Sequence, residues 1–294
     1  MPPNRAQPPP RPRQSSLAPV VGTRYIVANR ARPPATAGSL ARTLDGSPHG
    51  DARVTNAQNI ARLAGLLYLI VVVTGIFSLA YVPSQLALGE APTLAVSKIT
   101  ASPALFRWGL ASFLVEQVVF LILPLVLFRI FSPFGRIAAW LMVAFAAASV
   151  PVSLVALAQR ASILDSIATV GPVVGDATTQ ALVLLSLKQY ANGILAASLF
   201  WGLWLLPLGY LTLRSCLVPK ILGAMLIVGG LGYVVDVFGQ IISASYSSTT
   251  LAAYALLPAA VGEIGFCMWL VIVGTRSNSP PNHSPKPPPI RGVI

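Results

Sequence analysis

The chain has 294 residues, of which 55% are hydrophobic and 10% are charged, and its mean hydropathy is +0.73. A soluble globular domain carries about 25% charged residues, so this composition excludes that class and indicates an integral membrane protein. The net charge of +12 raises the question of nucleic-acid binding. However, nine of the 20 basic residues precede Leu63 and most others flank apolar runs, so we predict no nucleic-acid partner.

The first 58 residues are rich in Pro, Arg, Ala and Ser and show no apolar periodicity. Such a segment buries too little apolar surface to offset its ordering entropy, so we expect 1–58 to be a disordered cytoplasmic tail. Basic side chains near a membrane gain about 1 kcal/mol each from anionic lipids, so we expect this tail to contact lipid headgroups. Residues 276–294 are also polar and Pro-rich, and we predict a second disordered cytoplasmic tail there.

Six apolar runs between the tails are long enough to cross a membrane. About 20 apolar residues suffice, because about 30 Å of hydrocarbon is crossed at 1.5 Å per residue. The predicted spanning helices are Ile60–Val82, Ala104–Phe131, Arg136–Ala158, Tyr190–Leu213, Lys220–Ile242 and Leu251–Thr275. Residues 59–275 are therefore predicted to be an all-α, polytopic bundle of six transmembrane helices, with the lipid bilayer as its surroundings.

The connections between these runs differ in character. We predict a short helix after Pro92 and a tight turn at Ser132–Gly135, where Ser, Pro and Gly cluster. Residues 159–189 are more polar and are broken by the Gly171-Pro172 pair, with Asp176 as a candidate N-cap. The segment after Asp176 either lies at the membrane interface or runs straight into the next spanning helix.

The basic residues in short loops set the expected orientation. Arg129 and Arg136, and then Arg214 and Lys220, flank two turns on the same predicted side as both tails. The other side holds fewer bases, namely Lys98, Arg160 and Lys188. Since the side richer in Lys and Arg stays in the cytoplasm, we predict a multi-pass plasma-membrane protein with both termini cytoplasmic.

Three segments of the chain, which cover parts of four of these runs, resemble a known family. The segments ARLAGLLYLIVVVTGIFS (61–78), LFRWGLASFLVEQVVFLILPLVLFRIF (105–131) and GLWLLPLGYLTLRSCLVPKILGAMLIVGGLGYVVDVF (202–238) are similar to those of the DUF4386 family. This resemblance implies a six-helix integral protein of the bacterial inner membrane, from a family without an established biochemical activity. It carries over no catalytic residue.

Three of the eight acidic residues, Glu116, Asp236 and Glu263, fall inside predicted spans. An ionisable side chain there costs about 2.5–3.5 kcal/mol on insertion scales and tends to face the bundle interior. Asp236 and Gln240 continue a stripe of small residues that starts at Gly229 and Gly232, and Gly109, Ser112 and Glu116 form a similar stripe. We therefore take Glu116, Asp236, Glu263 and Gln240 as candidate ligand-binding residues.

The same acids also allow a structural interpretation. Each carboxyl group can be hydrogen-bonded to a neighbouring helix, or paired with Arg107 or Arg160, and so hold helices together. Small residues at three- and four-residue spacing likewise allow close helix packing without any ligand.

The chemistry-bearing residues do not favour an enzyme. The only histidines, His49 and His283, fall in the predicted tails, and no metal-ligand spacing or nucleotide-binding glycine motif occurs. We predict neither a catalytic site nor a metal or cofactor. Two functions remain open: a small carrier or ligand-binding bundle that uses its intramembrane carboxylates, and a non-catalytic membrane interaction or accessory protein.

Overall fold

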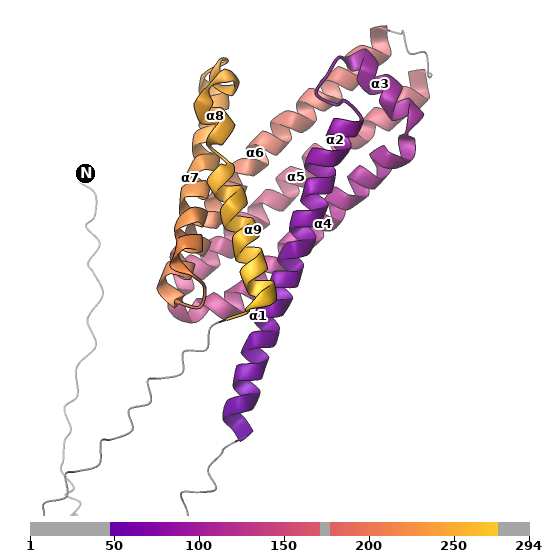
Figure 1. Ribbon diagram of the computed structural model, residues 1–294. Coiled ribbons are helices and arrows are strands. Elements are labelled where there is room, and N and C mark those ends of the chain that lie inside the picture. The colour runs from indigo at the N-terminus through magenta and orange to yellow at the C-terminus, as the bar shows by residue number, and fades with distance from the viewer. Residues whose placement is uncertain (1–47, 171–176, 276–294) are drawn as a thin grey trace, which may run out of the picture. The chain divides into compact units, whose positions relative to one another are not determined.

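The computed structural model describes residues 48–170 and 177–275, and these residues form one helical unit (Figure 1). Within them the regular structure is helical throughout, without strands. The helices are α1 (Pro48–Gly75), α2 (Val82–Gln85), α3 (Pro92–Ala101), α4 (Pro103–Phe131), α5 (Arg136–Val170), α6 (Ala177–Ser215), α7 (Lys220–Ile242), α8 (Thr250–Tyr254) and α9 (Leu257–Ile272). A π-helical segment, Ile76–Tyr81, joins α1 to α2.

Six stretches of this unit are long and apolar enough to cross a membrane. They are Ala57–Gln85, Pro103–Phe134, Arg136–Ala168, Ala177–Ser215, Lys220–Ile242 and Thr250–Ile272. Large apolar side chains such as Trp108, Ile137 and Ile242 lie on the outside of the bundle, as a lipid-facing surface requires. The predicted fold class, a polytopic bundle of six transmembrane helices, is confirmed.

The six long helices pack in a closed sequence of neighbours. α1 packs on α4, α4 on α5, α5 on α6, α6 on α7 and α7 on α9, and α9 returns to α1. Gly65 brings α1 close to α9, because a Cβ atom built on it would lie 2.7 Å from the backbone nitrogen of Val271. This closed ring of helices surrounds an interior, and each long helix can direct side chains into it.

Most of the predicted boundaries agree with the structure. α7 has the predicted bounds, α4 begins one residue early, and α3 follows Pro92 as expected. α1 begins at Pro48, upstream of the predicted start, and residues 1–47 and 276–294 of the tails lie outside the described residues. The sixth run is divided into α8 and α9, with Pro258 in the first turn of α9.

The interpretation of residues 159–189 as a polar connection was wrong over most of its length. α5 continues to Val170 and α6 begins at Ala177, so the second of the two predicted alternatives holds. The hydroxyls of Ser162 and Ser166 donate to backbone carbonyls one turn earlier, which lets these residues stay helical. Arg160, which we had placed in an outer loop, is therefore an interior residue of α5.

This correction also changes the basis for the predicted orientation. Lys188 lies within α6 and Asp165 within α5, not in a loop. Asp176, the expected N-cap, lies outside the described residues. Of the three bases assigned to the outer side, only Lys98 lies outside the membrane-spanning stretches, at the end of α3.

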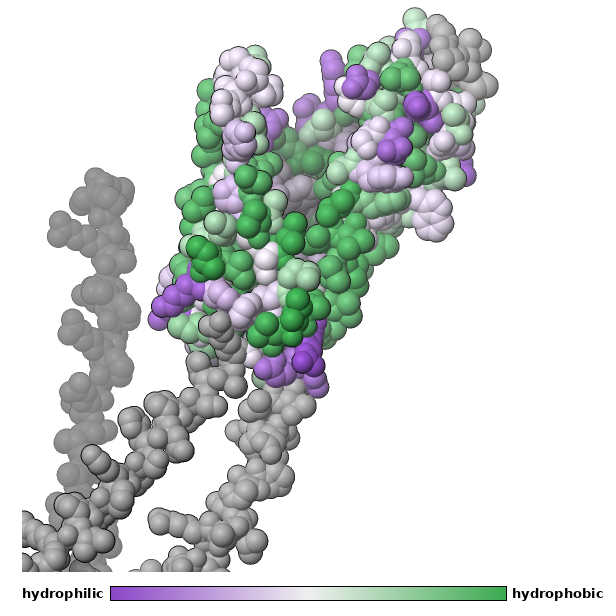
Figure 2. Space-filling view, in the orientation of Figure 1, coloured by the Kyte–Doolittle hydropathy of each residue, from purple (hydrophilic) through white to green (hydrophobic). Residues whose placement is uncertain are grey.

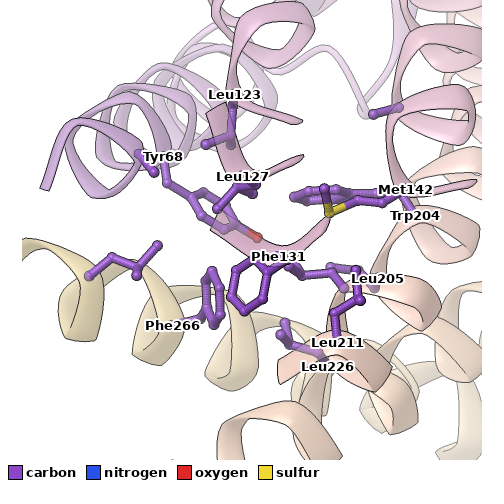
Figure 3. Packing of buried hydrophobic residues seen from close by; sticks show 14 of the residues in the cluster. Tyr68, Leu123, Leu127, Phe131, Met142, Trp204, Leu205, Leu211, Leu226 and Phe266 are labelled. Atoms are coloured by element: carbon purple, nitrogen blue, oxygen red, sulfur yellow. The ribbon is translucent and has the colours of Figure 1, made fainter. Parts of the chain in front are cut away.

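Two apolar clusters fill the bundle. The larger includes Tyr68, Leu127, Phe131, Trp204 and Phe266, and Figure 3 shows these side chains converging from α1, α4, α6 and α9. The smaller joins α2 and α3 to α4, α5 and α6. Its members are Val82, Leu86, Val96, Ile99, Phe106, Ile163 and Val183. α4, α5 and α6 carry members of both clusters, and buried polar residues lie between these members on α4 and α5.

The predicted stripe of small residues on α7 packs against α9. A Cβ atom on Gly229 would fall within van der Waals overlap of the Ala259 backbone, which cannot shift as a flexible side chain does. We expect Gly229→Ala to lower the free energy of unfolding by about 1–3 kcal/mol, the usual range for overpacking. Thermal unfolding in detergent measures this effect.

Gly89 provides the matched control, because nothing lies within 4 Å of a Cβ atom built there. Gly89→Ala should melt within experimental error of the wild type. Equal melting of Gly229→Ala and the wild type would contradict the close packing of α7 on α9.

Candidate ligand-binding site

On α4 and on α5, a buried polar side chain lies between members of the two apolar clusters. On α4, Glu116 lies between Phe106 and Phe120, which belong to different clusters. On α5, Arg160 lies between Val150 and Ile163 in the same way. Glu116 and Arg160 therefore lie at the level where the two clusters meet, whereas Glu263 on α9 lies between Ala259 and Phe266, which both belong to the larger cluster.

Two adjoining cavities occupy this level. The larger, of about 480 Å³, is lined from the π-helical segment, α5, α6 and α7, and the smaller, of about 190 Å³, from α1, α4, α6, α7 and α9. Leu79, Trp201 and Tyr233 line both, so the two cavities share a wall. Figure 2 shows the surface hollowed between the α8 end and the end that carries α2 and α3.

All four sequence-predicted residues line these cavities. Asp236 and Gln240 face the larger cavity, and Glu116 and Glu263 face the smaller. Asp236 and Glu116 are buried, whereas Gln240, one turn further along α7, is exposed. The three carboxyl groups, which come from α4, α7 and α9, are thereby gathered around one interior region.

Each carboxyl group accepts a hydrogen bond from a nearby side chain. Gln240 Nε2 donates to Asp236 Oδ2 at 2.7 Å within α7. Tyr68 OH donates to Glu263 Oε2 at 2.9 Å, which links α1 to α9. Ser78 Oγ donates to Glu116 Oε2 at 3.2 Å. These contacts support the hydrogen-bonded form of the structural interpretation.

The Glu116 contact depends on how α4 meets α1. Ser112 Oγ donates to the Thr74 carbonyl at 3.2 Å, and Gly109 lies directly against the Val82 side chain. The predicted stripe of Gly109, Ser112 and Glu116 therefore faces the α1–α2 segment. Ser78 lies in the π-helical part of that segment, and single π-helical turns within α-helices are frequent at functional sites.

Arg160 is the one cationic side chain among the residues that line the two cavities, and it is 1% exposed. Its Nη1 donates to the Ser78 carbonyl at 3.3 Å and to Tyr190 OH at 3.2 Å. No described carboxylate forms an ion pair with it, and Arg107 is exposed on the outside of α4. The alternative in which Arg107 or Arg160 pairs with an intramembrane acid is therefore wrong.

Several residues of the site were missed by sequence reasoning. Arg160 was considered only as an ion-pair partner, and Ser78, Tyr190, Tyr233 and Trp201 were not identified as site residues. Trp204 is a core residue, whereas Trp201 lines both cavities. One signal could have found Arg160, because no Gly or Pro interrupts the chain between Pro151 and Gly171.

The site offers no arrangement suited to a metal ion. Among the described residues, no group of three or more His, Cys, Asp and Glu side chains is placed to hold one. The polar atoms that line the cavities are carboxyl, amide, phenol, hydroxyl and guanidinium groups, and these suit hydrogen bonding and charge pairing with an organic ligand.

Comparison with known proteins assigns the chain to a family. The model of a family described as "Domain of unknown function (DUF4386)" matches residues 63–274, from α1 to the end of α9. The chain belongs to the DUF4386 family. The matched range includes every residue that lines the two cavities, so the site lies within the part of the chain that the family model covers.

A curated relative gives a shorter match. An uncharacterized protein of Archaeoglobus fulgidus is 32% identical over 78 residues, which is 26% of this chain and 44% of that protein. The alignment thus spans less than half the length of this relative. No solved structure matches the chain.

The hydrogen bond between Tyr68 and Glu263 can be tested by a double-mutant cycle. We expect Tyr68→Phe and Glu263→Gln to be coupled by about 0.5–2 kcal/mol, the range for side-chain hydrogen bonds between membrane helices. Thermal unfolding of the two single variants and the double variant in detergent gives this coupling energy.

Glu90 supplies the control, because it is exposed between α2 and α3. The effects of Tyr68→Phe and Glu90→Gln should be additive. If the effects of Tyr68→Phe and Glu263→Gln on stability are additive as well, the hydrogen bond between Tyr68 and Glu263 is contradicted.

Proposed function

We propose that this DUF4386 protein binds a small polar ligand within its helical bundle, as a carrier or a ligand-binding protein. Glu116, Asp236, Glu263 and Gln240 are its polar determinants. One observation carries the proposal: carboxyl groups from three different helices line two adjoining cavities that share Leu79, Trp201 and Tyr233. Packing alone does not require acids that are far apart in the sequence to gather at a cavity.

The size and chemistry of the larger cavity support this proposal. Its volume of about 480 Å³ lies within the range of about 300–1,000 Å³ typical of small-molecule sites. Its walls combine apolar and aromatic side chains with a few polar groups, which is the usual composition of such sites. Intramembrane acids are costly to retain, and a ligand-binding role accounts for three of them together.

We propose a binding or transport role without catalysis. Histidine, the commonest general base, does not line the two cavities among the described residues, and neither do Cys or Lys. The alternative function, a membrane interaction or accessory protein, predicts co-purification with one protein partner and no solute flux.

We further propose that the protein lies in the plasma membrane of a bacterial cell with both termini in the cytoplasm, where its basic N-terminal residues contact anionic lipids. The α4–α5 turn carries Arg129 and Arg136 at its two sides, and the α6–α7 turn carries Arg214 and Lys220. In Figure 1 both turns lie at the same end of the bundle, which supports a single basic face.

The two cysteines make the proposed orientation testable. Cys216 is exposed in the α6–α7 turn, whereas Cys267 is buried in α9. A membrane-impermeant maleimide should therefore label the protein in inverted vesicles and leave it unlabelled in intact cells. Cys216→Ser is the control and should abolish labelling in both preparations. Labelling of Cys216 in intact cells would contradict the orientation.

The proposed ligand-binding role predicts how neutral variants behave. Glu116→Gln, Asp236→Asn and Glu263→Gln should melt at or above the wild-type temperature, because a site that retains costly acids for function gives up stability to do so. The same variants should lose solute flux in proteoliposomes, or the stabilisation by a bound solute, by about tenfold or more.

Glu90→Gln is the matched control, because it removes one acid outside the membrane-spanning helices and should leave both properties unchanged. If the three cavity variants melt below the wild type, and no solute produces flux or stabilisation, the acids are structural. The accessory-protein alternative would then replace the proposed function.

A further inference from the structure

The guanidinium of Arg160 has more hydrogen-bonding capacity than the protein uses. Only Nη1 has acceptors, while Nε and Nη2 are buried and have no hydrogen-bond partner among the described residues. An arginine side chain is always charged in proteins, and an unpaired charge inside a membrane bundle is strongly unfavourable. Both free nitrogens therefore favour the binding of an acceptor that the protein itself does not supply.

The guanidinium is held in place by two aromatic rings. Its central carbon lies 4.9 Å from the ring centroid of Tyr190 and 5.6 Å from that of Phe106. Cation–π contacts of this kind suit arginine, whose planar group is weakly hydrated and presents its donors in a rigid fork. With Nη1 already bonded, Nε and Nη2 are left for a planar or tetrahedral oxyanion, to which arginine binds through two parallel hydrogen bonds.

Arg160 shares its cavity with groups of opposite character. Asp236 and Gln240 line the same cavity from α7, and Arg160 lines it from α5, with α6 packed between these helices. The cation and the carboxyl group do not pair with each other, since neither has the other as a partner. Opposite charges that line one cavity without pairing are complementary to a ligand that carries both charges.

We propose that the larger cavity binds a small zwitterion, with its carboxylate or phosphate group on Arg160 and its ammonium group beside Asp236 and Gln240. This inference rests on the proposed function and narrows its ligand class. Carboxylate and phosphate share the chemistry that arginine recognises. Such a molecule can be a free solute, or it can be the phosphate and ammonium of a lipid headgroup.

Tyr190 and Ser78 position Arg160 for this role. Both accept hydrogen bonds from the same nitrogen, Nη1, which leaves Nε and Nη2 for the ligand. Ser78 also donates through its hydroxyl to Glu116, so it connects the oxyanion end of the larger cavity to the carboxyl group in the smaller one.

The probe for this proposal is phosphoethanolamine, which joins a phosphate to an ammonium, and its two halves are tested as inorganic phosphate and ethanolamine. The full-length protein in detergent is melted with each probe at matched ionic strength. We expect phosphoethanolamine to raise the melting temperature at a concentration about tenfold below that needed for either half.

Two variants assign the two charges. Arg160→Gln should abolish the shift with phosphate and phosphoethanolamine, and Arg160→Lys should weaken it, because lysine keeps the charge and loses the fork. In the Asp236→Asn variant, phosphoethanolamine should raise the melting temperature no more effectively than inorganic phosphate does. Arg107→Gln is the matched control, since it removes an exposed arginine of α4, and it should behave as the wild type. If Arg160→Gln does not fold, Arg160→Lys and Asp236→Asn provide the same assignment.

A second arm distinguishes a free solute from a lipid headgroup. In nanodiscs of phosphatidylethanolamine, a free-solute site should still respond to phosphoethanolamine. A headgroup site should show no further response, and phosphatidylethanolamine added to the detergent-purified protein should stabilise it in an Arg160-dependent manner. Either result supports a zwitterion site.

Two outcomes would overturn the inference. The first is that neither phosphoethanolamine nor phosphatidylethanolamine produces an Arg160-dependent shift. The second is that ethanolamine alone stabilises the protein, that this effect requires Asp236, and that it is unchanged in Arg160→Lys. This outcome would contradict the zwitterion site but would leave the proposed ligand-binding function in place. A bundle that responds to no solute in these assays or in flux measurements would fail both proposals.

Discussion

A buried arginine is the feature on which the rest of the interior depends. Arg160 carries a permanent charge at a level of the bundle where water is scarce, so its surroundings must provide hydrogen-bond acceptors and aromatic faces. The Ser78 carbonyl, the Tyr190 hydroxyl and the rings of Tyr190 and Phe106 meet this requirement. These groups come from the π-helical segment, α4 and α6, so the position of one side chain on α5 fixes the arrangement of three other segments.

The acids follow from the same requirement. The Ser78 carbonyl accepts a hydrogen bond from Arg160, and the Ser78 hydroxyl donates one to Glu116, so Ser78 links the cation to this carboxyl group. A direct ion pair would neutralise both groups and close the space between them. With a serine between them, each charged group keeps capacity for a further partner, and the cavities keep their polar walls. On α4 and α5, the two apolar clusters lie on either side of Glu116 and Arg160.

Much of the fold could be predicted from the sequence, because the length of an apolar run is a direct consequence of membrane thickness. The bounds of α7 agree with the prediction, since Pro219 and the polar residues after Ile242 mark its ends clearly. Residues 159–189 could not be interpreted in this way. Their polar side chains are satisfied by backbone carbonyls within the helix and by contacts across α5 and α6, such as that of Ser162 with Ser186. Hydropathy alone does not register such contacts.

The candidate site was predictable to the same degree. An acid inside an apolar run is conspicuous, so Glu116, Asp236 and Glu263 were identifiable one helix at a time. Arg160 was not, because its place in a loop or a helix depends on where α5 ends, and that is decided by packing of Ile163 and Val183 in the smaller cluster. The phenols Tyr190 and Tyr233 are ordinary membrane residues by composition and become site residues only through their neighbours. Each acid stands alone in the sequence as an unfavourable charge inside an apolar run, whereas in the folded bundle Asp236 lines the same cavity as Arg160, and Glu116 and Glu263 line the adjoining one.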